Sequence, residues 1–148
     1  MEKKVCEALR LDNQLCFALY STSLAMNKLY KPLLQELGLT YPQYLMMMVL
    51  WEEDGITATE LSKRLVQDLG ALSPVIKRLE SQGLINRLRN EKDDRKIHLY
   101  LTNAGKTLQV QAESVPEKIL CASNLTAEKS LALKDQLESL RASLMGKA

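Results

Sequence analysis

The sequence contains little of the chemistry on which most enzymes depend. Its 148 residues include one histidine, one tryptophan and one phenylalanine. The histidine, His98, falls on an outward position of an expected strand, and no glycine-rich phosphate loop, paired metal-ligand spacing or nucleophile elbow accompanies it. We therefore expect a protein that has no metal or other cofactor and is not an enzyme.

Cysteine is also scarce, and Cys6, Cys16 and Cys121 are spread widely along the chain. An odd number at this spacing excludes a disulfide scaffold and a zinc site with paired ligands. A free cysteine usually packs as a small hydrophobe, and in mid-helix Cys16 would gain little from a helix N-terminus. Tyr20, one turn later on the same face, favours a redox role instead, because a phenol hydroxyl can donate a hydrogen bond to a thiolate. The residues alone leave both interpretations open.

Long hydrophobic runs are absent as well. The most apolar stretch, 44–51, has eight residues, whereas a membrane-spanning helix needs about 18 or more. The first residues lead into charged sequence rather than into the apolar core of a signal peptide. We expect a soluble, cytoplasmic chain with no membrane partner.

The formal net charge is only +2, but the charge is unevenly distributed. Residues 62–106 hold ten Lys and Arg against five Asp and Glu, a net of +5, while residues 1–61 hold five against eight, a net of −3. Residues 107–148 hold five of each. A basic third between acidic and neutral flanks indicates an anionic partner, and an ordinary solvated surface is the alternative.

Apolar residues recur at helical spacing over residues 11–37, which predicts a helix. Pro32 lies inside this helix, and we expect a kink or a break there, with Pro32 opening a second helix. Gly38 closes that segment, and Pro42 begins another helix whose stretch 44–51 is apolar on every side. This helix should be central and buried.

Two short helices joined by a tight turn follow. Thr57 and Glu60 are spaced as a capping box, in which a hydroxyl and a carboxylate satisfy each other's backbone donors at the start of a helix. A break at 68–70 precedes a second helix over about 71–82, which is basic on its outer face and ends at Gly83. This is the arrangement of a helix-turn-helix.

Two strands, at 84–89 and 96–101, flank a charged tip at 90–95, and we expect this hairpin to project into solvent. A helix-turn-helix followed by such a hairpin is a winged helix, here at about 57–102. The expected fold is mainly α with a small β-hairpin wing, a winged helix-turn-helix, in one domain spanning 1–148.

The two ends of the chain are predicted to be helical and amphipathic. A helix capped by Thr126 places leucines on one stripe, at positions Leu133, Leu137, Leu140 and Leu144. Because the winged helix is complete without the ends, the helices at about 8–37 and 116–146 are candidates for dimerisation. Packing within one chain is the alternative.

Several segments resemble a known family. They read LDNQLCFALY at 11–20, KLYKPLL at 28–34 and LTYPQYL at 39–45. With the wing segment at 93–105, they closely resemble the organic hydroperoxide resistance regulators (OhrR) of the MarR family of bacterial repressors, from about residue 11 to 144. The wing signature is broad in the family, whereas the cysteine-containing block is specific to the peroxide-sensing branch.

The resemblance implies a homodimeric winged-helix repressor that binds a pseudo-palindromic operator on double-stranded DNA when reduced. An organic hydroperoxide would oxidise its cysteine and release the DNA. Matching positions make Cys16 the peroxidatic cysteine, with Tyr30 and Tyr41 hydrogen-bonding to it and Tyr20 as a nearby contributor. The segment around Cys121 resembles the branch in which a second cysteine resolves the sulfenic acid, and there the disulfide forms between the subunits.

For DNA, the resemblance implies that the second helix of the helix-turn-helix enters the major groove. The implied contacts are Ser73, Lys77 and Arg78 on that helix, Arg95 at the wing tip in the minor groove, and Arg87, Arg89 and Lys96 at phosphates. The chain departs from the family at Leu69 and Ala71, where relatives commonly carry hydroxyl residues. The operator sequence can therefore not be taken from the family.

Two other functions are compatible with the same residues. One is a MarR-type repressor controlled by a small apolar ligand in the cleft between the dimer helices and the winged domain, with Cys16 inert. The other is a thiol peroxidase that uses the same cysteine pair catalytically. The basic middle third and the wing argue against the peroxidase, because neither serves that chemistry.

Overall fold

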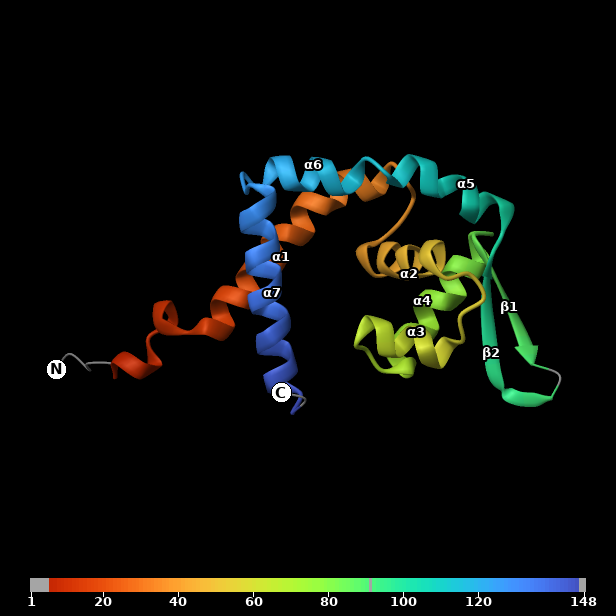
Figure 1. The fold of residues 1–148 in the computed structure, drawn as a ribbon, viewed down its shortest axis with the longest axis horizontal. Coiled ribbons are helices and arrows are strands. Elements are labelled where there is room, and N and C mark those ends of the chain that lie inside the picture. The colour runs from red at the N-terminus through yellow and green to blue at the C-terminus, as the bar shows by residue number, and fades with distance from the viewer. Residues whose placement is uncertain (1–5, 91, 147–148) are drawn as a thin grey trace. The chain divides into compact units, whose positions relative to one another are not determined.

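A computed structural model describes residues 6–90 and 92–146, apart from the side chains of residues 90 and 93–95. Helices dominate, and two strands form an antiparallel hairpin (Figure 1). The elements are the 3-10 turns η1 (Glu7–Leu9) and η2 (Leu11–Asn13), then α1 (Leu15–Gln35), α2 (Tyr41–Glu52), α3 (Ala58–Leu65), α4 (Leu69–Ser81), β1 (Ile85–Asn90), β2 (Asp93–Leu101), α5 (Asn103–Ala112), α6 (Val115–Ala122) and α7 (Ala127–Leu144). The predicted class, mainly α with a small β-hairpin, is confirmed.

The chain divides into two compact units, residues 1–112 and 113–148. The first unit holds α1 to α5 and the hairpin, and the second holds α6 and α7. No helix in the described parts of the chain is both long and apolar enough to cross a membrane.

Helix α1 starts later than the apolar spacing predicts. Residues 7–13 form two 3-10 turns instead, because the side-chain amides of Asn13 and Gln14 donate to backbone carbonyls of the preceding turns. The Asn13 amide donates to the Glu7 carbonyl at 2.9 Å, and the Gln14 amide donates to the Ala8 carbonyl at 2.7 Å. Such local bonds compete with helix formation.

The predicted break at Pro32 is wrong, because α1 continues through it to Gln35. A proline removes one backbone donor and disfavours a helix interior by about 3 kcal/mol. Here Leu34, 2% exposed, anchors the last turn, and α1 packs against α2. Tertiary packing therefore overrides the local preference. Gly38, with φ +70°, ends the helical segment as predicted.

Helix α2 is the buried, central helix that the sequence predicts. Thr40 caps it in a reciprocal box, in which the Thr40 hydroxyl accepts from the Gln43 N–H and the Gln43 amide oxygen accepts from the Thr40 N–H. Met46 and Met47 are fully buried, and α2 contacts α1, α3, α4, α5 and β2. It is the element around which the first unit is packed.

The helix-turn-helix consists of α3 and α4. Of the predicted capping box, the structure shows the bond from the Glu60 N–H to the Thr57 hydroxyl, at 3.1 Å. Helix α4 begins at Leu69, two residues before the predicted start, because Gly70 lies in its first turn rather than in a break. Gly83, with φ +75°, ends α4 as predicted.

The wing is an antiparallel pair of β1 and β2, with Arg87 opposite Leu99 and a register shift after Arg89. Because β2 already begins at Asp93, the tip is shorter than the predicted 90–95. His98 does not simply face outward as predicted. It is half-buried, and its Nδ1 lies 3.0 Å from the carbonyl oxygen of Gly55.

Helix α5 packs closely against the start of the hairpin. The indole Nε1 of Trp51 donates to the Gly105 carbonyl at 2.9 Å, and the Thr102 N–H donates to the Leu84 carbonyl at 3.0 Å. A Cβ atom on Gly105 would collide with that same Leu84 carbonyl. Only glycine permits this close approach of helix and strand.

Pro116 lies in the first turn of α6, in the second unit. The Thr126 hydroxyl caps α7 by accepting from the Lys129 N–H at 3.1 Å. On the predicted leucine stripe of α7, Leu133, Leu137 and Leu144 are exposed and Leu140 is half-buried. The single chain therefore exposes most of the apolar leucine surface that a second subunit would have to bury.

Candidate functional site

Cys16 is the second residue of α1, so the mid-helix position expected for it is wrong. Gln14, two residues before Cys16, lies at the N-cap and makes no side-chain capping bond, and Cys16 is exposed. The first backbone N–H groups of a helix have no intrahelical partner, and the helix dipole places partial positive charge there. Cys16 therefore lies in the turn of α1 whose N–H groups carry this partial charge.

Three tyrosines gather where the end of α1 meets the start of α2. The ring centroids of Tyr30 and Tyr41 lie 4.9 Å apart, and those of Tyr41 and Tyr44 lie 6.4 Å apart with nearly parallel planes. Tyr30 and Tyr41 were both predicted site residues, and the structure brings them together. Tyr44 completes this tyrosine cluster and is also buried in the core, as predicted. Its i, i+3 spacing from Tyr41 on one helix could have indicated its place in the cluster.

The pKa values of the clustered tyrosines lie above the ordinary value of about 10. Burial, reinforced by the neighbouring Tyr41 and Tyr44, raises the pKa of Tyr30 to about 12. Burial also raises the pKa of Tyr41, and burial followed by Tyr41 raises the pKa of Tyr44. Neutral phenols are hydrogen-bond donors, so this cluster can stabilise an anion placed against it.

The raised pKa of Tyr30 predicts an alkaline titration step. Below pH 10 the phenol is protonated in both folded and unfolded chains, and between pH 10 and about 12 only the folded chain keeps its proton. Stability contributed by this group is therefore lost as pH rises through that window. In an ultraviolet titration of tyrosinate, the wild-type curve minus the Tyr30→Phe curve should have its midpoint near pH 12, and a midpoint near pH 10 would contradict the burial.

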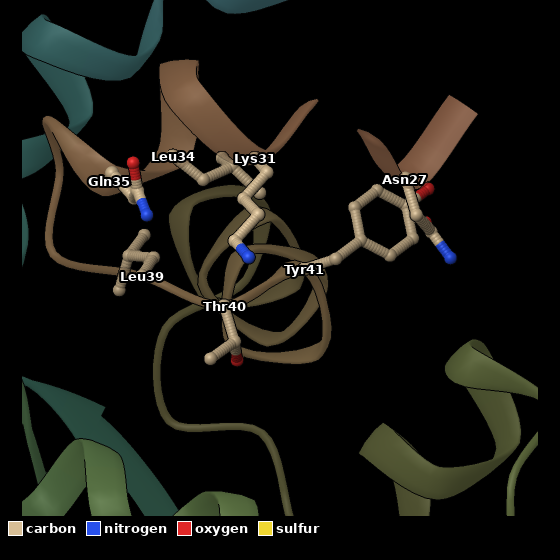
Figure 2. Close-up of a pocket in the computed structure, with 7 residues that line it drawn as sticks. All are labelled: Asn27, Lys31, Leu34, Gln35, Leu39, Thr40 and Tyr41. Atoms are coloured by element: carbon tan, nitrogen blue, oxygen red, sulfur yellow. The ribbon is translucent and has the colours of Figure 1, made fainter. Parts of the chain in front are cut away.

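A cavity of about 320 Å³ opens beside the tyrosine cluster (Figure 2). Its described lining comes from α1 and from the start of α2, namely Asn27, Lys31, Leu34, Gln35, Leu39, Thr40 and Tyr41. Figure 2 shows the Lys31 side chain extending from α1 toward Thr40 at the start of α2. The cavity has the size of a small-molecule site and combines apolar walls with one cationic side chain among these residues.

The structure does not bring Cys16 to the tyrosine cluster within one chain. Cys16 and Tyr30 lie 14 residues apart on the continuous helix α1, which separates them by about 21 Å along its axis. Tyr20 lies one turn from Cys16 and is 65% exposed. The cysteine with Tyr20 and the cluster with Tyr30 and Tyr41 are thus two halves of the predicted site at opposite ends of one helix.

Cys121 lies in α6 of the second unit, where it is exposed. All three cysteines of the chain are free in this structure. Among the described residues, no group of three or more His, Cys, Asp or Glu side chains could hold a metal ion.

The predicted DNA contacts lie on α4 and the wing. Ser73, Lys77 and Arg78 are exposed on α4, and Arg89 and Lys96 are exposed on β1 and β2. Arg95 lies in β2, but its side chain is outside the described part of the structure.

Arg87 is already engaged within the chain. Its guanidinium forms an ion pair with Glu80 of α4 at 3.0 Å, and its backbone N–H also donates to that carboxylate. The hydrogen bond from Arg87 lowers the pKa of Glu80. Arg87 therefore joins the second helix of the helix-turn-helix to the wing, a role that its sequence position did not reveal.

Comparisons with known proteins identify the family. Residues 28–111 match the family model described as transcriptional regulator SarA/Rot. The chain is 44% identical over 140 residues to the organic hydroperoxide resistance transcriptional regulator of Bacillus subtilis, covering 95% of each. The chain belongs to the OhrR branch of the MarR family of transcriptional regulators. The prediction of a regulator rather than an enzyme is confirmed by these relatives.

Solved structures of MarR-family proteins share the fold. Reduced AbfR of Staphylococcus epidermidis bound to DNA is 34% identical with a TM-score of 0.76, over 94% of this chain and 97% of that one. A disulfide form of AbfR is 34% identical with a TM-score of 0.64, over 95% and 96%. A MarR variant from E. coli in complex with operator DNA is 27% identical with a TM-score of 0.72, over 85% and 92%. The winged helix-turn-helix fold predicted for this OhrR-branch chain is confirmed.

Proposed function

We propose that this chain is a peroxide-sensing transcriptional repressor of the bacterial cytoplasm that acts as a homodimer. The observation that carries the proposal is the division of the redox site between the two ends of α1. An exposed cysteine at a helix N-terminus and a cluster of protonated tyrosines lie about 21 Å apart. A second copy of the chain, with its α1 antiparallel to the first, would place each Cys16 against the partner's tyrosines.

The exposed apolar surface of the terminal helices supports such a dimer. Leu15, Phe17 and Leu24 are exposed on α1 in the single chain. Three leucines of the stripe on α7 are exposed as well, namely Leu133, Leu137 and Leu144. Monomeric soluble proteins seldom expose apolar stripes of this length, and burying them would supply the driving force for association. We assign dimerisation to residues 8–37 and 116–146 and DNA binding to the winged helix at 57–102.

The redox cycle follows from the chemistry of a thiolate. The sulfur of Cys16 attacks one peroxide oxygen of an organic hydroperoxide, the O–O bond breaks, and the products are a sulfenic acid and an alcohol. The thiol of Cys121 of the partner subunit then attacks the sulfenic sulfur, and a disulfide and water form. The disulfide form known for AbfR supports this second step.

DNA release follows from the geometry of operator binding. Two recognition helices of a dimer must fit successive major grooves about 34 Å apart. A covalent bond between the subunits would alter that spacing, so both helices could no longer bind at once. The basic wing and the exposed Lys77 and Arg78 of α4 would hold the reduced dimer on double-stranded DNA.

The cavity beside Tyr41 favours a second candidate function. Its volume of about 320 Å³ and its mixed lining suit a small apolar ligand with an anionic group. In that case the repressor would respond to the ligand itself, and Cys16 would be inert.

A gel shift with DNA from upstream of the chain's own gene tests the proposal. We expect the reduced protein to bind this DNA, cumene hydroperoxide to release it, and dithiothreitol to restore binding. A non-reducing gel of the released protein should show a covalent dimer. Binding that hydroperoxide leaves unchanged, but that a non-peroxide analogue such as cumyl alcohol abolishes, would favour the ligand-controlled repressor.

A further inference from the structure

The first two turns of α4 present an apolar surface where a DNA-reading helix usually presents polar side chains. Leu69, Gly70, Ala71 and Pro74 are all exposed, and none has a hydrogen-bonding side chain. We call these four residues the apolar head of α4. Lys77 and Arg78, the exposed cations of this helix, come only in the later turns.

The hydroxyl within these turns is already engaged. Ser73 Oγ donates to the carbonyl of Leu69 at 3.2 Å, so its proton is directed into the helix backbone. Leu69 is 43% exposed, and with Ser73 it lines a small cavity of about 60 Å³ between α4, the start of α3 and the wing. At Gly70 the surroundings are open, which lets a partner approach the backbone closely. The side chains of the head can therefore make apolar contacts but cannot form hydrogen bonds.

These features determine which base edges the head can accept. The N-terminal residues of a recognition helix meet the base edges in the major groove. Base edges buried against the head without a hydrogen-bonding partner would lose water at a free-energy cost. Thymine is the base that presents a methyl group there, and apolar side chains contact that methyl favourably.

We propose that the apolar head of α4 selects thymine in each operator half-site by packing against its 5-methyl group, with Leu69 as the main contact. Lys77 and Arg78 supply the attraction to phosphate that brings the helix into the groove. The inference rests on the proposed function, because it requires that α4 reads operator DNA. It adds which base is read at the head of the helix and by which chemistry.

A scan with deoxyuridine tests the proposal. Each thymine of a footprinted operator half-site is replaced in turn by deoxyuridine, which removes only the methyl group and keeps base pairing. For the reduced wild-type protein, we expect Kd to rise about fourfold at one or two positions, the factor for one buried methyl group, and to stay constant elsewhere.

Variants then assign the effect to the head. In Leu69→Ala, replacing thymine by deoxyuridine should no longer raise Kd at one of those positions. The contact between Leu69 and the thymine methyl group is already lost in this variant. Leu88→Ala is the matched control, because Leu88 is also an exposed leucine, 57% exposed on the wing strand β1. The deoxyuridine scan of this variant should match that of wild type. Ala71→Ser, which leaves Leu69 in place, should keep the rise in Kd that depends on Leu69, and thermal unfolding checks that every variant is folded.

Each outcome decides the question. Thymine selection is overturned if deoxyuridine raises Kd of the wild-type protein at no position. It is also overturned if the same rises in Kd persist in Leu69→Ala. If such a protein still binds its operator and leaves it on oxidation, the proposed function stands and only this inference fails. If the reduced wild-type protein binds no operator, the proposed function itself has failed.

Discussion

Cys16→Ser should stay on its operator at concentrations of organic hydroperoxide that release the wild-type protein completely. A serine hydroxyl is not a nucleophile toward peroxide and cannot form a sulfenic acid, so the first step of the cycle is lost. Because Cys16 is exposed in the first turn of α1, the substitution removes one reactive atom without disturbing a packed core. The measurement is a hydroperoxide titration of the protein–DNA complex by gel shift.

The other two cysteines provide controls for this result. After oxidation, Cys121→Ser should run as a monomer on a non-reducing gel, whereas Cys6→Ser should still form the covalent dimer. A dimer that persists in Cys121→Ser would assign the second cysteine to Cys6 instead. If Cys16→Ser is released by hydroperoxide like wild type, the sensor is not Cys16.

Gly105→Ala should destabilise the first unit by about 3 kcal/mol or more, a size reached when overpacking is combined with a lost buried hydrogen bond. The new Cβ would collide with the backbone carbonyl of Leu84, which cannot rotate away as a side chain could. Moving α5 outward would break the bonds from Trp51 to Gly105 and from Thr102 to Leu84. Urea unfolding at fixed chain concentration measures the loss.

Gly70→Ala is the matched control, because it is the same substitution in another helix. No atom lies within 4 Å of a Cβ at Gly70, and alanine favours a helix over glycine by up to about 1 kcal/mol. We expect Gly70→Ala to be as stable as wild type or more so. Equal stability of Gly105→Ala and wild type would show that α5 does not pack against the start of the hairpin as described.

The elements of the fold were predictable where their signals are local. Thr40, Thr57 and Thr126 each cap the helix that the sequence predicts, and Gly38 and Gly83 each adopt the positive φ that ends one. Caps and glycine conformations depend on neighbouring residues, so the chain carries their signals in short segments. The error at Pro32 arose because a distant contact decided the outcome, since its helix is held together by the burial of Leu34.

The candidate site was predictable only in part, for the same reason. Cys16, Tyr30 and Tyr41 were found by resemblance, but nothing in their spacing showed that Tyr30 and Tyr41 are in contact. The ion pair between Arg87 and Glu80 joins residues on different elements, so it could not be read from either segment. The cavity beside Tyr41 likewise exists only once α1 and α2 are packed.

By itself the sequence determined the order of the helices, the hairpin wing, the basic middle third and the residues available for redox chemistry, because periodicity, caps and charge are properties of local segments. The tertiary structure decided how those residues are distributed. Even the local bonds from Asn13 and Gln14, which delay the start of α1 and place Cys16 in its first turn, became visible only in the structure. Packing of α1 on α2 gathers the tyrosines at the other end. A rigid helix keeps the two halves apart.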